Sequence, residues 1–141
     1  MFQIRTAARA APACLLLLAV GCSDGRPPVH SVDGTLAYTD GTPVPGAASV
    51  TFHTEADGKT YQARGAVGPD GKFRLTTFAP DDGAVAGEHK VSVAAVPGGE
   101  ERPGPTVAPQ YASTETSGLT VTVQSGSNAP VIKIERPKGK K

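Results

Sequence analysis

The chain has 141 residues, enough for one domain; it contains 17 glycines, 13 prolines and no tryptophan. Its formal charge is +1, but of its 14 basic residues Arg5 and Arg9 lie in the first 21 positions. The remainder therefore has twelve basic against thirteen acidic residues, a net charge of about −1, which argues against a nucleic-acid partner.

The first 21 residues have the features of an export signal. Residues 1–9 contain two arginines and no acid, and an apolar stretch follows at 10–20. A bilayer-spanning helix needs about 20 apolar residues, so this stretch is too short to cross a membrane. A core helix is disfavoured because polar, proline and glycine residues follow at once. A basic start, a short apolar region and small residues before a cleavage point predict a secretory signal peptide at 1–21.

The end of this segment, Leu18-Ala19-Val20-Gly21-Cys22, resembles the lipobox of bacterial lipoproteins, with Ala19 where leucine is commonest. In that family the cysteine thiol is diacylglycerated before cleavage. The resemblance implies that Cys22 is the lipidated first residue of the mature protein. Two or three acyl chains on this residue would attach the protein stably to a membrane. The alternative is an ordinary signal peptide with an incidental cysteine.

This resemblance has consequences for redox chemistry and location. Cys14 would leave with the signal, so the single remaining cysteine would be acylated and no disulfide could form. In Gram-negative lipoproteins, aspartate after the cysteine favours inner-membrane retention. Ser23 at that place implies an exported protein anchored to the cell envelope at the outer membrane. Residues 22–30 are then the lipidated cysteine and a short polar tether.

Seven segments behind the tether alternate apolar and polar residues between turns. They lie at 31–38, 48–54, 59–67, 72–78, 88–96, 118–124 and 130–136. Asp-Gly pairs at 40–41, 57–58, 70–71 and 82–83 indicate turns. Strands with one apolar side suit two facing sheets around one core, so we expect an all-β sandwich. The segment 97–110 has four prolines and predicts a long surface loop.

A family resemblance covers residues 31–136. The segments "VDGTLAYTDGTPVPGAASVTF" (32–52), "GPDGKFRLTTF" (68–78) and "DGAVAGEHKVSVA" (82–94) resemble signatures of carboxypeptidase-regulatory-like, transthyretin-like domains. The later "QYASTETSGLTVTV" (110–123) is similar to the tail of short bacterial lipoproteins built from little besides this domain. The resemblance implies a single seven-stranded Greek-key sandwich, followed by a basic tail at 137–141.

We expect no catalytic residue, no cofactor and no metal site. The transthyretin-like hydrolase of 5-hydroxyisourate ends in a Tyr-Arg-Gly-Ser motif that this sequence lacks. His30, His53 and His89 share no metal-ligand spacing: His53 falls on the solvent side of its strand, and His89 falls near the core edge where the family has an aromatic. The Asp-Gly pairs lack the calcium-loop pattern. An intramolecular isopeptide is disfavoured because the first strand has no lysine and the sole asparagine, Asn128, precedes the last strand.

These observations predict a monomeric, non-catalytic structural or protein-interaction module, held at the membrane by its lipid anchor and facing an envelope protein or polysaccharide. One alternative is a small-ligand or carbohydrate-binding module at the loops 54–60 and 97–110, with Phe78 and Tyr111 as exposed aromatics. A hydrolase of the transthyretin-like family is the remote alternative. Five basic residues among the last nine could contact anionic lipid or polysaccharide, or form a frayed terminus.

Overall fold

The computed structural model describes residues 24–44, 48–96 and 107–138, which form an all-β fold with almost no helix. The strands are β1 (Val29–His30), β2 (Asp33–Tyr38), β3 (Ala48–Ala56), β4 (Lys59–Val67), β5 (Lys72–Arg74), β6 (Ala84–Val85), β7 (Gly87–Ala95), β8 (Leu119–Val123) and β9 (Val131–Ile134). A 3-10 turn (Pro109–Ala112) and the one-turn helix α1 (Thr114–Ser117), neither of them predicted, precede β8. The predicted signal peptide, Cys22 and most of the 97–110 loop lie outside the described residues.

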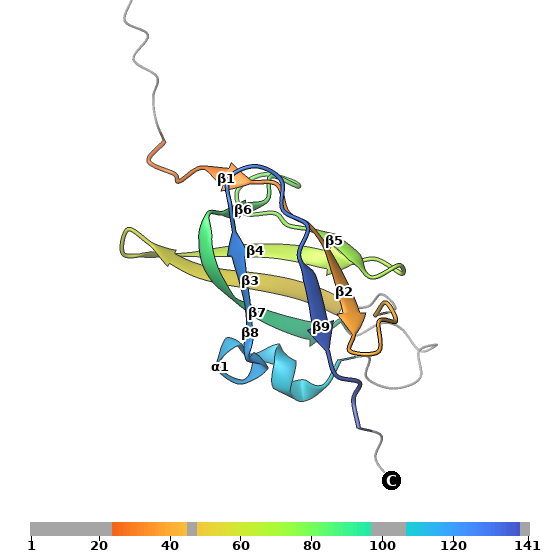
Figure 1. Cartoon of the computed structure of the whole chain (residues 1–141). Coiled ribbons are helices and arrows are strands. Elements are labelled where there is room, and N and C mark those ends of the chain that lie inside the picture. Colours follow the sequence, from red (N-terminus) through yellow and green to blue (C-terminus); the bar gives the residue numbers. More distant parts are fainter. Residues whose placement is uncertain (1–23, 45–47, 97–106, 139–141) are drawn as a thin grey trace, which may run out of the picture.

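The strands form three sheets (Figure 1). One has the order β5-β2-β9, a second has the order β4-β3-β7-β8, and a small one pairs β1 with β6. The pair β2–β9 is parallel, with Thr35 opposite Val131 and Tyr38 opposite Ile134, whereas the other ladders are antiparallel. The chain ends of the described part lie apart: β1 and β6 are at one end of the molecule, α1 and the exit of β9 at the other (Figure 1).

One apolar core joins the two larger sheets. On β3, Val50 and Phe52 are fully buried while Thr51 between them is half-buried, as the alternation predicts. The Phe52 ring contacts the Phe73 ring of β5 across the sheets, with centroids 6.2 Å apart. Further core side chains come from the other predicted segments, Leu36, Ala63, Leu75, Val91, Val93, Val123, Ile132 and Ile134 among them, and a few, such as Val44 and Val107, come from between the segments. Ala95, predicted to face the core, is exposed at the end of β7.

The hairpin between β3 and β4 has a two-residue turn. Asp57 and Gly58 have φ of 51° and 71°, the positive values that a tight turn between right-twisted strands requires. The predicted Asp-Gly turn is therefore confirmed at this position.

The strand predicted at 72–78 is shorter than expected. Its ladder with β2 ends at Arg74, and the next residue, Leu75, donates its N–H to the Val32 carbonyl at 3.3 Å. Thr76 then exchanges two 2.9 Å backbone hydrogen bonds with Arg64 of β4. The chain passes here from one sheet to the other, so one run of alternating residues serves two sheets.

Strand pairing begins two residues before the predicted first strand. Val29 lies opposite Val85 and His30 opposite Ala84 in the β1–β6 pair. Gly83 has φ +100°, and a Cβ at this position would lie 1.9 Å from the His30 carbonyl oxygen. Glycine is thus required here both for its backbone conformation and for the close approach of the two segments.

Candidate functional site

The described part of the predicted tether contacts the β-domain at a small cluster, which we call the Phe78 platform (Arg26, Tyr61 and Phe78). The Arg26 guanidinium carbon lies 5.3 Å from the centroid of the Phe78 ring. Tyr61 of β4 meets the same ring edge-on, with centroids 6.1 Å apart. Phe78 remains 38 % exposed, one of three large exposed apolar side chains among the described residues. Part of the predicted tether therefore contacts the fold.

The loop that presents Phe78 is held by a single carboxylate. Asp82 accepts hydrogen bonds from the backbone N–H groups of Thr77 (2.7 Å), Phe78 (2.9 Å) and Ala79 (2.8 Å). Partial burial by itself raises the pKa of Asp82, but these N–H donors outweigh it and bring the pKa below 3.8. The Thr77 hydroxyl also donates to the Gly83 carbonyl at 2.7 Å. The loop is thus a structured support for the ring.

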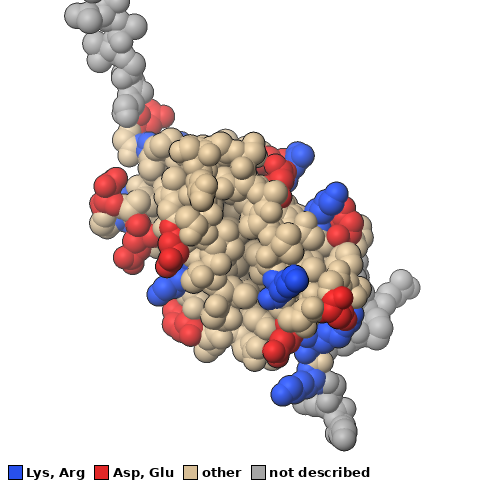
Figure 2. Space-filling model, in the orientation of Figure 1, with Lys and Arg blue, Asp and Glu red and all other residues tan. Residues whose placement is uncertain are grey.

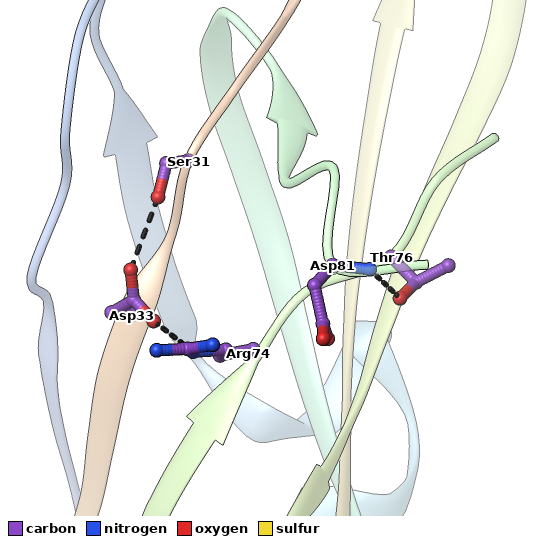
Figure 3. A network of polar contacts seen from close by, with 5 residues as sticks. All are labelled: Ser31, Asp33, Arg74, Thr76 and Asp81. Atoms are coloured by element: carbon purple, nitrogen blue, oxygen red, sulfur yellow. Dashed lines mark hydrogen bonds and ion pairs between the residues drawn. The ribbon is translucent and has the colours of Figure 1, made fainter. Parts of the chain in front are cut away.

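A polar network lies at the start of β2 (Figure 3). Asp33 accepts from the Ser31 hydroxyl at 3.0 Å and from Nε of Arg74 at 2.6 Å, while the Asp81 N–H donates to the Thr76 hydroxyl at 2.9 Å. Both side chains of the Asp33–Arg74 ion pair are more than half exposed, so the pair contributes little to stability. It borders an open hollow of about 210 Å³ that Asp81 also lines.

A second hollow, of about 440 Å³, lies beside the predicted ligand loop 54–60. It is lined by His53, Thr54, Glu55, Thr60, Glu88, Lys90, Thr114 and Glu115. A hydrogen bond from the Ser113 hydroxyl lowers the pKa of Glu115. Carboxylates, hydroxyls and one lysine offer many hydrogen-bonding groups to a polar ligand, but the hollow is open to solvent.

The three histidines occupy separate places. His30 accepts a hydrogen bond from the Gly126 N–H at 3.3 Å, and His53 is half-buried on the outer side of β3. His89 is 1 % exposed, and the centroid of its ring lies 5.6 Å from that of Phe52. Its Nε2 forms a hydrogen bond of 2.7 Å with the Val85 carbonyl. Within the described ranges no three His, Cys, Asp or Glu side chains gather as a metal site would require.

Tyr111, predicted as an exposed aromatic, is buried, and that prediction is wrong. Its hydroxyl accepts the N–H of Glu135 at 2.9 Å, so the ring fastens the chain that follows β9. The last residue before the predicted tail is fastened too: Arg136 pairs with Asp40 at 2.9 Å, and its guanidinium carbon lies 4.1 Å from the centroid of the Tyr38 ring.

Sequence reasoning missed Arg26, Tyr61 and Asp82 as partners of Phe78. Arg26 lies in a tether with no periodic pattern, and alternation places Tyr61 on the inner face of its strand, whereas its ring packs against Phe78. The one available signal was the Asp-Gly pair at 82–83, which indicated a turn but not what that turn presents.

Charged side chains are interspersed in both signs on the face shown in Figure 2, and no patch of one sign stands out. The upper part of that face, toward the exit of residues 24–28, is mostly uncharged (Figure 2). This face therefore offers no concentrated basic field for a nucleic acid.

In the part of the chain that the structure describes, no helix is long and apolar enough to span a bilayer. Comparison of the chain with models of known protein families, with curated proteins and with solved structures gives no significant match.

Proposed function

We propose that this chain is an exported lipoprotein, attached through acylated Cys22 to the cell envelope at the outer membrane, and that its β-domain is a structural or protein-interaction module. The observation that carries the proposal is the short distance in sequence between two features. Cys22 ends a lipobox-like sequence, and Val29, only seven residues later, is already paired in β1. A domain placed so close to an anchoring residue is suited to display at a membrane surface.

The finer fold belongs to the same proposal. Seven strands, β2, β3, β4, β5, β7, β8 and β9, divide into a group of three and a group of four over one core. This division supports a Greek-key sandwich of the transthyretin-like kind. The parallel pairing of its first and last strands places them side by side, with the entry to β2 and the exit from β9 at opposite ends of the pair.

The proposed role is non-catalytic because three described titratable groups with a lowered pKa, Asp40, Asp82 and His89, serve the fold. Asp82 holds a loop, and His89 bonds to a buried carbonyl. Asp40 accepts from the Thr42 N–H at 2.8 Å and pairs with Arg136, which together lower its pKa to about 2. General acid–base catalysis needs a group positioned toward a substrate with a pKa near the working pH.

Membrane fractionation of Cys22→Ala tests the anchor. In cells that process lipoproteins, the wild-type chain should sediment with membranes, and its N-terminal peptide should carry the mass of the acyl chains. The Cys22→Ala variant should move to the soluble fraction, whereas Cys14→Ala, which changes the other cysteine, should remain with the membranes. Membrane retention of the Cys22→Ala variant would contradict the proposal.

A carbohydrate-binding module is the second candidate, favoured by the polar hollow beside Glu55 and Glu88. Cross-linking and affinity capture from envelope extract, with the Glu55→Gln/Glu88→Gln variant as control, separates the two. Capture of a defined protein by both chains favours the interaction module. Capture of polysaccharide that the double variant loses favours the ligand-binding module.

A further inference from the structure

The Phe78 platform combines an exposed apolar ring with an adjacent cation. Phe78 is 38 % exposed and lies beneath the Arg26 guanidinium at 5.3 Å. A single exposed apolar side chain is common on protein surfaces, so what Phe78 does depends on how it is held and on what lies beside it. The proposed function as a lipid-anchored module does not by itself use this pair.

The platform is rigidly built. Asp82 fixes the backbone on both sides of the ring through three N–H donors, and the edge of Tyr61 supports the ring from β4. A side chain exposed on such a support keeps its orientation, whereas a ring on a loose loop could fold back onto the protein. The fold thus holds Phe78 outward at a definite position.

The length of chain between the platform and Cys22 limits what the ring can face. Arg26 is the fourth residue after Cys22, and an extended chain spans at most about 3.6 Å per residue, roughly 14 Å in all. The headgroup layer on each side of a bilayer is itself about 5–8 Å thick. With its acyl chains in the membrane, Cys22 would keep Arg26 and Phe78 within reach of lipid headgroups.

The charge of this region indicates which headgroups it suits. Arg26 is accompanied by Asp24 in the tether and by Asp81 in the Phe78 loop, so the surface is not a cationic patch. A guanidinium binds a phosphate oxygen well, and aromatic rings sit at the headgroup level of a bilayer. A zwitterionic phospholipid supplies that phosphate without requiring net positive charge on the protein.

We propose that the Phe78 platform rests on the membrane surface, with the Phe78 ring in the interfacial layer and Arg26 on a phospholipid phosphate. The inference depends on the proposed lipid anchor and adds to it an orientation: the end of the domain with β1 and β6 faces the bilayer, and the end with α1 and the exit of β9 faces away (Figure 1). The anchor alone would leave the domain free to rotate.

The test uses the absence of tryptophan from the chain. A Phe78→Trp variant of the full-length, acylated protein carries one fluorescent indole at the platform. It is reconstituted into phosphatidylcholine vesicles with brominated acyl chains, which quench tryptophan at short range. Because interfacial side chains enter about 5–10 Å into the headgroup boundary, we expect roughly twofold quenching and a blue-shifted emission relative to unbrominated vesicles.

The matched control is Val96→Trp, which replaces another exposed apolar side chain, 46 % exposed. Val96 follows the end of β7, nine residues from Gly87 beside β6, and nine strand residues span about 30 Å. Its tryptophan should show no quenching. An Arg26→Gln change in the Phe78→Trp chain should reduce the quenching, because it removes the phosphate contact.

The outcomes separate the inference from the anchor. If Phe78→Trp floats with the vesicles but is quenched no more than Val96→Trp, the orientation is wrong and the anchor stands. If the chain does not float with vesicles, or floats equally well after Cys22→Ala, the anchor fails and the orientation fails with it. If added envelope polysaccharide, and not brominated lipid, changes the indole emission of the Phe78→Trp variant, the platform is a sugar-binding surface and the inference is overturned.

Discussion

His89 is a titratable side chain enclosed in an apolar core. Its Nε2 donates to the Val85 carbonyl, and Nδ1 has no hydrogen-bond partner among the described residues. Burial lowers the pKa of His89 below 6.5, the bond to Val85 opposes this, and nearby His53 adds to the lowering. Protonation would therefore place a charge on a buried ring, and the new Nδ1–H would have no hydrogen-bond acceptor among the described residues.

The free energy of unfolding should depend on pH through this residue. Because the pKa of His89 is lower in the folded than in the unfolded chain, the unfolded chain binds the proton first as the pH falls. Stability is then full above pH 6.5 and is lost below it, until the folded pKa is reached. Urea unfolding between about pH 7.5 and pH 5 should reveal a loss of at most about 1.4 kcal/mol per pH unit.

His89→Gln should flatten that dependence, because the amide can still donate to Val85 but does not titrate. His53→Gln, on the outer side of β3, should keep it. An unchanged slope in His89→Gln would show that another group causes the pH dependence. The position of His89 could be foreseen from its parity with Val91, but its bond to Val85 could not, since β6 has no sequence signal of its own.

The pairing of β1 with β6 depends on one glycine. A Cβ on Gly83 would collide with the His30 carbonyl oxygen, whereas a Cβ on Gly41, which also has a positive φ, would meet nothing within 4 Å. Both alanine variants carry the conformational strain of a positive φ, of about 1 kcal/mol or more. Only Gly83→Ala must in addition push the two segments apart.

Hydrogen exchange provides the measurement for this pair. In Gly83→Ala, the amides in the β1–β6 pair should lose protection, while the β3–β4 ladder keeps its own. In Gly41→Ala, the amides of the β1–β6 pair and those of the β3–β4 ladder should remain protected. Equal protection of β1 in the two variants would mean that the close approach at Gly83 does not hold the strand in place.

The seven longer strands were predictable because each shows several periods of alternation, and a buried side requires that pattern. The end of β5 was not, because alternation continues through Leu75 while the hydrogen-bonding partner changes from β2 to β4. The two-residue strands β1 and β6 contain a single period at most, so no pattern can indicate them. The Phe78 platform could not be predicted for a similar reason, since its three residues come from a tether, a strand and a loop and share no sequence pattern.

At the scale of the whole molecule, the domain should fold without its first 30 residues, though less stably. A fragment of residues 31–141 should be monomeric and β-rich by circular dichroism, because the core of the two larger sheets is complete within it. A fragment of residues 24–141 adds the β1–β6 pair, and with about 1 kcal/mol per hydrogen bond we expect it to be about 1–3 kcal/mol more stable.

Urea unfolding of the two fragments at one pH measures this difference. Equal stability would mean that β1 contributes nothing to the fold. A helical spectrum from either fragment would contradict the all-β architecture itself.

The parallel pairing of β2 with β9 also has a mechanical consequence. The chain enters β2 at the end of the molecule where β1 lies and leaves β9 at the opposite end (Figure 1). Tension between an anchored front and a tethered rear would slide these strands along each other. Bonds such as those from the Thr35 N–H to Pro130 and from the Thr39 N–H to Ile134 lie across that pull and share the load. Bonds loaded this way break together and not one by one, so the β2–β9 pair should resist stretching between its two ends.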